Sequence, residues 1–231
     1  MVKQGIEQFD RPQKIHLSYV VGGSGGAGVT VMRTTFLGLK SNFDVWLDGK
    51  WQQRKPYTER EIIEFPQPYG KTGVYWFDVA ETYTFVDSFP VETVITKFGS
   101  VPDIYNHLTW ITADIFPQAL TTSKFGIEFL SRVSYWMTTV TDKFSGIGVA
   151  MRAEITGIKA GKETKYCSTM IHENTAIAAG AGTGSIAQLI LEGKVKKPGI
   201  YPVEQALSTE LFLAAMKSRN IEISKQLTVG N

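Results

Sequence analysis

The chain has 231 residues, of which 43% are hydrophobic and 20% charged, and its formal net charge is +2. This length and composition are typical of a globular protein with a substantial core, and so small a net charge argues against nucleic acid or an anionic membrane as a partner. Cys167 is the single cysteine, which excludes an internal disulfide and leaves sulfur-based metal sites without ligands, so we expect a reducing, cytoplasmic setting and no bound metal.

The beginning of the chain contains a glycine-rich loop. Residues 1–13 are predicted to be a linker or a truncated helix, followed by a strand over 14–21, the loop over 22–28 and a helix over 29–39. Gly23, Gly25 and Gly28 formally satisfy the G-x-G-x-x-G pattern of dinucleotide-binding loops. The residues beyond favour another fold, because Asp48-Gly49 between apolar and aromatic residues is a strong signal for a type I′ hairpin.

Residues 57–99 are aromatic and β-branched, with interspersed proline and glycine, and predict short antiparallel strands and turns without a helix. A dinucleotide-binding domain would instead continue through strand–helix–strand crossovers. We therefore interpret the glycine-rich loop as structural or substrate-binding, and keep nucleotide binding as an alternative.

A helical insertion is predicted over about residues 102–145. Its first helix opens at Pro102-Asp103 and ends at Pro117, with one apolar stripe formed by Ile104, Leu108, Ile111 and Ile115. Its second helix, over about 124–143, places the following residues on a common face: Phe125, Phe129, Val133, Trp136 and Val140. The insertion is expected to form a helical subdomain or an interface arm.

The last third of the chain predicts a long hairpin and two helices. Apolar residues alternate from 149, and the hairpin turns at Ala160-Gly161. Asn174 is expected to cap a helix over 175–191, in which Gly180, Gly182 and Gly184 would allow close packing against another backbone. With a final helix over 209–219, residues 14–231 are predicted to form an α+β fold, a mixed and largely antiparallel sheet flanked by helices.

Several motifs, taken in their order, resemble the substrate domain of saccharopine dehydrogenases of the reductase type. They are Ser18-Tyr19 before Gly22-Gly23, Trp46-Leu47-Asp48-Gly49-Lys50, and the runs at 65–70, 96–99, 183–187 and 199–207. Together they span nearly the whole chain. The resemblance places the glycine-rich loop in the substrate domain.

Family members carry an NADP- or NAD-binding Rossmann domain ahead of this region. Because only residues 1–13 precede the first strand, we expect a detached fragment, the product of a split gene or one half of a two-chain enzyme. The resemblance thus implies a chain that binds no cofactor itself and is inactive until a cofactor domain supplies NADP or NAD.

The substrates of this family are amino-acid or polyamine conjugates joined through a C–N linkage, so the resemblance implies an amino-acid-like substrate with carboxylates. Arg33 is the first choice for a bidentate carboxylate clamp and Arg152 the second. Gly23, Ser24 and Gly25 could present backbone N–H groups to the same carboxylate. A surface or interface role for each arginine, and a purely structural turn for the loop, are the alternatives.

Proton transfer near neutral pH favours histidine. His107 is a candidate in the polar–aromatic run 105–107, and His172 with Glu173 is a candidate where the long hairpin meets the next helix. Structural roles are the alternatives, helix capping among them for Glu173. His16 is expected to pack or pair within its strand, and Cys167 to be an inert thiol.

The first functional hypothesis is a substrate-binding and dimerisation domain of an NAD(P)-dependent oxidoreductase. A non-catalytic scaffold and a nucleotide-binding protein are the alternatives. We expect a homodimer formed by the long hairpin and the aromatic helices, a small-molecule ligand, and neither nucleic acid nor a membrane as partner. A polar pocket with an arginine beside the loop would favour the substrate domain, whereas an apolar or filled space would favour the scaffold.

Overall fold

The computed structural model describes residues 1–230, and for Gln118 the backbone alone. Its strands are β1 (Arg11–Gly22), β2 (Phe43–Leu47), β3 (Lys50–Arg54), β4 (Glu61–Glu64), β5 (Lys71–Trp76), β6 (Thr93–Val101), β7 (Val149–Lys159), β8 (Lys162–His172) and β9 (Ile223–Val229). Its helices are α1 (Val2–Ile6), α2 (Val29–Gly38), α3 (Ala80–Ser88), α4 (Ile104–Asp114), α5 (Gln118–Thr122), α6 (Lys124–Ser145), α7 (Thr175–Leu191), α8 (Val203–Ala206) and α9 (Thr209–Lys217).

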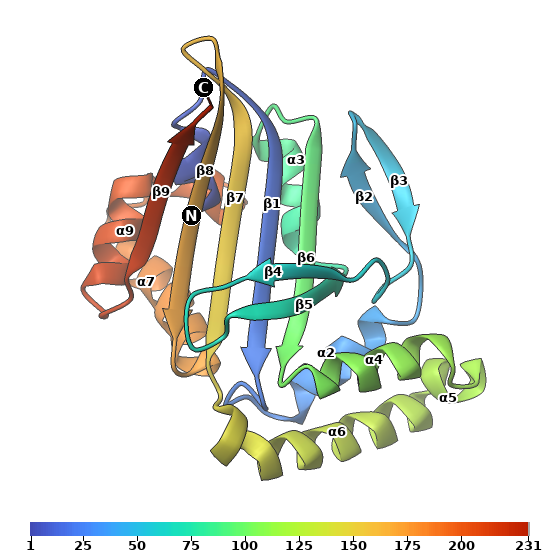
Figure 1. Ribbon diagram of the computed structural model, residues 1–231. Coiled ribbons are helices and arrows are strands. Elements are labelled where there is room, and N and C mark those ends of the chain that lie inside the picture. Colours follow the sequence, from blue (N-terminus) through green and yellow to red (C-terminus); the bar gives the residue numbers. More distant parts are fainter. Residues whose placement is uncertain (231) are drawn as a thin grey trace.

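The strands form one mixed sheet in the spatial order β3-β2-β6-β1-β7-β8-β9, and the β4–β5 hairpin joins it through β6 (Figure 1). Strands β1 and β6 are parallel. The other strand pairs are antiparallel. This architecture confirms the predicted α+β fold with a mixed, largely antiparallel sheet.

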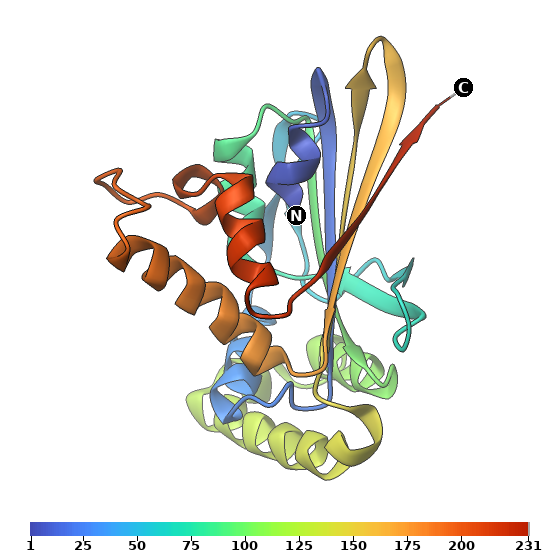
Figure 2. The ribbon, with the colours of Figure 1, turned by 90° about the vertical axis from the view of Figure 1, so that its left-hand side faces the viewer.

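The two faces of the sheet differ in what covers them. Helices α1, α3, α7 and α9 lie on one face, while the β4–β5 hairpin crosses the other (Figure 2). On the helical face, Ile15, Leu17 and Ile155 pack with Val2 and Phe85 in the main core. The alternation of strand side chains sends His16, Ser18 and Arg152 to the opposite face, which we call the open face.

A second group of helices stands at the end of the sheet where β1 and β6 finish (Figure 1). Helix α2 follows β1 through the glycine-rich loop, and α4 to α6 follow β6 before the chain returns as β7. The predicted insertion over about 102–145 is therefore present and lies at the carboxyl ends of the parallel pair. Within the described residues, every helix falls short of the length and apolar character that crossing a bilayer demands.

Both predicted hairpin turns have the left-handed backbone that their sequences favour. Asp48 and Gly49 have φ of 52° and 73°, and Ala160 and Gly161 have φ of 49° and 76°. Positive φ at both central residues fits the type I′ turn, whose twist matches that of the flanking strands. The predictions of these two hairpins are confirmed.

One local prediction is wrong, and a second is correct in only one of its alternatives. Residues 57–99 contain a helix, α3, in which Thr82 and Phe85 face the sheet, and the Thr82 and Thr96 hydroxyls lie 2.6 Å apart. Tertiary packing here overrides the strand propensity of the aromatic and β-branched residues. For residues 1–13 the structure has the helix and not the linker: α1 packs on the core, its Lys3 Nζ donates to the Leu207 carbonyl at 2.6 Å, and β1 already begins at Arg11.

The glycines of α7 do not serve the predicted close packing. The helix itself is confirmed, with the Asn174 side chain accepting from the Ile177 N–H. A Cβ at Gly180, Gly182 or Gly184, however, would meet no atom within 4 Å among the described residues. The predicted contact of these glycines with another backbone is therefore wrong for this chain.

Candidate functional site

A cavity of about 490 Å³ lies at the carboxyl ends of β1 and β6, enclosed by the glycine-rich loop, helices α2, α4 and α6 and the start of α7. In open α/β sheets, ligands bind outside the carboxyl ends of parallel strands, and a volume of this size suits a small organic molecule. A smaller cavity of about 300 Å³ lies between the sheet and α9, away from the loop. The larger cavity is therefore the candidate site.

The wall of this cavity is apolar and uncharged. Among the described residues that line it, none is Asp, Glu, Lys, Arg or His. The aromatic residues of the wall are Tyr19, Phe36, Phe77, Phe98, Tyr105 and Phe116. Several hydroxyl groups donate to their own helix backbone, as Thr112 and Thr138 do to Leu108 O and Ser134 O. Such a wall can hold an apolar ligand and offers it a few hydroxyl contacts.

Tyr19 is the polar group of the wall that the sequence analysis did not single out. Its ring packs against Phe98, with centroids 5.3 Å apart. Burial raises the pKa of the Tyr19 phenol well above its usual value, so the group stays protonated. Its hydroxyl has no hydrogen-bond partner among the described residues and can therefore donate to a ligand. The sequence offered one signal for Tyr19: it stands close to the carboxyl end of β1, just before the glycine-rich loop.

The glycine-rich loop, predicted to bind the carboxylate of a substrate, holds the carboxylate of Asp142 on α6. The Ser24 N–H donates to Asp142 Oδ1 at 2.7 Å, and the Ser24 hydroxyl donates to Oδ2 at 2.6 Å. Gly23 has a φ of 48°, and a Cβ there would overlap the Asp142 carboxylate. The loop thus anchors α6. This contact fits the structural role that was the alternative to substrate binding for Gly23, Ser24 and Gly25.

Three further amides of the loop have partners within the chain, whereas those of Gly28 and Val29, at the start of α2, have none among the described residues. Gly23 N–H donates to Val101 O, Gly25 N–H to Gly22 O, and Gly26 N–H to the Ser24 hydroxyl. A coenzyme diphosphate at this loop would find these donors engaged and would meet the negative charge of Asp142. Gly23 to Gly26 therefore do not fit a coenzyme diphosphate, because their amides are engaged and Asp142 lies against them.

Arg33 faces α6 and is already bound by a carboxylate of this chain. Its Nε and Nη2 donate to Glu128 Oε2 at 2.9 and 2.7 Å, and Arg132 binds the other oxygen of Glu128. The hydrogen bonds from Arg33 and then Arg132 lower the pKa of Glu128. Arg33 joins α2 to α6 and does not line the cavity, so its position fits the interface role.

Arg152 lies on the open face of the sheet, away from the cavity. It donates to the Glu64 carbonyl and to Glu154 Oε2, each at 3.0 Å, and Lys165 binds the other oxygen of Glu154. Burial raises the pKa of Glu154, but the hydrogen bonds from Lys165 and Arg152 outweigh this and lower it below its usual value. The two arginines are thus on different parts of the molecule and cannot clamp one substrate together.

The predicted acid–base residues also lie apart from the cavity. His107 is exposed on α4, with its Nε2 3.4 Å from Asp103 Oδ2. His172 Nδ1 accepts from the Asn174 N–H at 3.0 Å and so shapes the turn into α7, while Glu173 is exposed. None of the three lines the cavity, and in the described part of the chain no cluster of His, Cys, Asp or Glu could hold a metal ion.

No protein-family model matches the sequence. The geometry defines the candidate site: a charge-free cavity beside a loop in which Ser24 already holds the Asp142 carboxylate.

Proposed function

We propose that this chain is the ligand-binding domain of a saccharopine-dehydrogenase-like NAD(P)-dependent oxidoreductase and that its ligand is largely apolar. The cavity beside the glycine-rich loop carries the proposal. The family part rests on the resemblance of the motifs, of which Tyr19, Gly23 and Gly25 line that cavity. The hydride carrier would be supplied by a cofactor domain, and this chain would orient the molecule that reacts.

The chemistry of the wall decides the ligand class. A zwitterion with two carboxylates would lose its hydration in a cavity without any cation, which costs several kcal/mol per charge. An apolar body gains about 25 cal/mol for each Å² removed from water. The Tyr19 hydroxyl would donate to a carbonyl or imine nitrogen, the kind of group at which such enzymes add hydride. We therefore propose an apolar carbonyl or imine compound in place of a dicarboxylic amino acid.

Calorimetric titration of the wild-type chain tests this ligand class. A neutral naphthyl ketone should bind, and glutamate, as a dicarboxylic amino acid, should not. Tyr19→Phe should weaken binding of the ketone by about fivefold to tenfold, because one hydrogen bond is lost. The same variant should bind N-phenyl-1-naphthylamine, which has no carbonyl, with the wild-type affinity. Tighter binding of glutamate than of the ketone would overturn the proposed class.

A non-catalytic scaffold is the second candidate. It is favoured by the engagement of Arg33 and Arg152 with carboxylates of the chain itself, and by the apolar character of the space beside the loop. A scaffold has no need for a hollow cavity of this volume, which favours the first candidate. Failure of every neutral probe to bind would support the scaffold, whereas submillimolar binding of NADPH would support the nucleotide-binding alternative.

A further inference from the structure

Helix α6 has apolar residues on both of its sides: Ile127 and Leu130 pack with Phe36 in a core cluster, and a second set points to solvent. Ser131 and Thr138 are 0% and 5% exposed on the side facing the protein, while Phe125 and Phe144 are 80% and 89% exposed. We call the outer side the aromatic face, which consists of Phe125, Phe129, Trp136, Val140 and Phe144; Val133 borders it and also lines the cavity. A surface helix of a globular protein normally carries polar residues on its outer side, so this exposed apolar face is suited to an apolar environment.

Helix α4 lies beside α6 and repeats the pattern. The Tyr105 hydroxyl of α4 lies within 3.4 Å of the Met137 carbonyl of α6. The polar Asn106 and Thr112 are buried, whereas Ile104 and Ile115 are 59% and 63% exposed. Two neighbouring helices at one end of the molecule (Figure 1) thus turn apolar residues outward.

The aromatic face is large for an apolar patch exposed to solvent on a monomeric protein. An aromatic side chain offers about 150–250 Å², so the four aromatic residues of the face alone expose on the order of 500 Å². Contiguous apolar patches above a few hundred Å² mark sites that contact a protein or a membrane. The charges around the face distinguish between these two.

The exposed charges at the ends of the aromatic face are positive. Lys124 and Lys143 stand at the two ends of α6 and have no ion-pair partner among the described residues. The acidic residues of α6 are engaged elsewhere, Glu128 with Arg33 and Arg132, and Asp142 with Ser24. Aromatic residues on one side of a helix, with lysine at its flanks, are typical of helices that lie in a lipid–water interface.

A second copy of the chain fits these charges less well. In a two-fold contact each residue of one copy meets its counterpart in the other, so antiparallel pairing of two α6 helices brings Lys124 of one near Lys143 of the other. No free carboxylate of α6 is available to offset this repulsion. Anionic lipid headgroups would instead neutralise both lysines.

We propose that the aromatic face binds the surface of an anionic lipid bilayer, with α6 lying in the plane of the interface. The small net charge of the whole chain argued against a membrane partner, because a net charge does not report where on the surface the lysines lie. The proposal goes beyond the ligand-binding function and does not depend on the cavity being filled.

Flotation with lipid vesicles tests the proposal on the full chain. The wild type should float with vesicles of phosphatidylcholine and phosphatidylserine, and less with phosphatidylcholine alone or at high salt. Phe125→Glu combined with Phe144→Glu should lower the vesicle-bound ratio at least about tenfold. Lys124→Glu combined with Lys143→Glu should abolish the preference for phosphatidylserine.

The matched control is Leu191→Glu combined with Ile200→Glu, because these side chains are 88% and 102% exposed outside the face. This control should float like the wild type, and all variants should keep the wild-type circular dichroism spectrum. The proposal would be overturned if the wild type did not bind vesicles, or if the control variant lost vesicle binding to the same extent as Phe125→Glu with Phe144→Glu. So would a wild-type dimer that Phe125→Glu with Phe144→Glu converts to monomer without any vesicle binding, which would assign the face to a second copy.

Discussion

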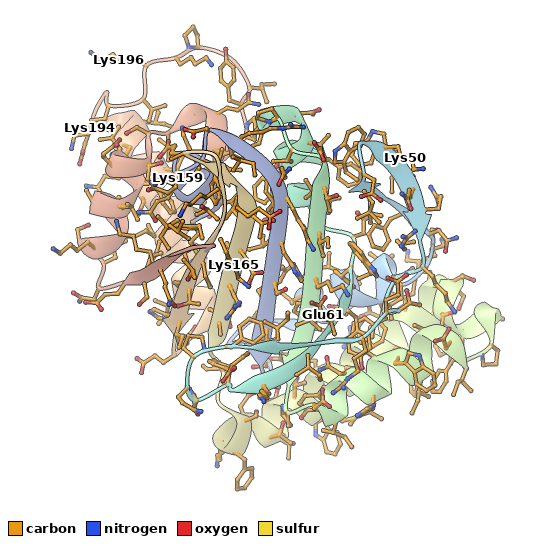
Figure 3. All side chains as sticks on the ribbon, turned by 45° about the horizontal axis from the view of Figure 1, so that its top comes forward. Lys50, Glu61, Lys159, Lys165, Lys194 and Lys196 are labelled. Carbon is orange, nitrogen blue, oxygen red and sulfur yellow. The ribbon has the colours of Figure 1, made fainter. Side chains whose placement is uncertain are left out.

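His16 is a largely buried titratable residue on the open face, and its environment makes the stability of the fold depend on pH. It lies in β1, where the β4–β5 hairpin covers it, with its Nε2 3.7 Å from Glu61 Oε2. Figure 3 shows Glu61 on β4, in front of the sheet. Burial lowers the pKa of His16 from 6.5 to about 4, against the opposing effect of Glu61. The ring is therefore neutral in the folded protein at pH 7, and its expected packing role fits this position.

This pKa predicts that the free energy of unfolding falls as the pH drops from about 6.5 towards 4. The unfolded chain binds a proton at His16 in this range and the folded chain does not, so acid favours unfolding, by on the order of 3 kcal/mol in full. His16→Gln should reduce this slope in urea denaturation measured across the range. Equal slopes in wild type and His16→Gln would contradict the assignment.

At the residue scale, the sequence analysis identified the loop residues beside the cavity but not their partners, and its other candidate residues lie outside the cavity. The curled backbone of the loop predicted a carboxylate site, and Ser24 indeed binds a carboxylate. That the carboxylate is Asp142, 118 positions away, depends on how α6 packs, which no local pattern reports. Arg33 and Glu128 are the same case. Tyr19 was overlooked because its role depends on a cavity that only the assembled helices create.

At the scale of elements, α7 offers a direct test of what its glycines do. Because a Cβ at Gly180 or Gly184 would meet open space, Gly180→Ala and Gly184→Ala should each raise the free energy of unfolding by roughly 0.5–1 kcal/mol through helix propensity. Thermal and urea denaturation would measure this.

The control for this series is Gly148→Ala, whose Cβ would overlap the Tyr69 hydroxyl and the His172 carbonyl, and which should destabilise the protein. Destabilisation by Gly180→Ala instead would show that another chain covers α7 in solution, and would restore the close packing that the sequence predicted.

Elements were predictable where a strong local signal agreed with the packing. The hairpins turning at Asp48-Gly49 and Ala160-Gly161, and the capped helix after Asn174, combine a turn or cap residue with a clear apolar period. Helix α3 was missed because its composition favours strands, while its contact with β6 favours a helix. The stripe of α6 was read correctly as one face, but periodicity does not tell whether a face points to the core or outward.

At the scale of the whole molecule, the order of strands and the insertion at one end of the sheet create a feature that no single motif encodes. The carboxyl ends of β1 and β6, the loop and three helices meet around a cavity of about 490 Å³. On α6 the small polar residues Ser134 and Thr138 face it, at a helical spacing visible in the sequence. Their significance depends on α2 and α4 standing opposite.

The central claim, that this cavity binds an apolar molecule, is tested most directly by filling it. Ser134 of α6 lines the cavity, whereas Thr139 of the same helix is exposed outside it, so Ser134→Trp and Thr139→Trp form a matched pair. Titration with N-phenyl-1-naphthylamine, followed by its fluorescence, should show binding to wild type and Thr139→Trp and at least about tenfold weaker binding to folded Ser134→Trp. Equal binding by Ser134→Trp and wild type, or no binding by wild type, would contradict the claim.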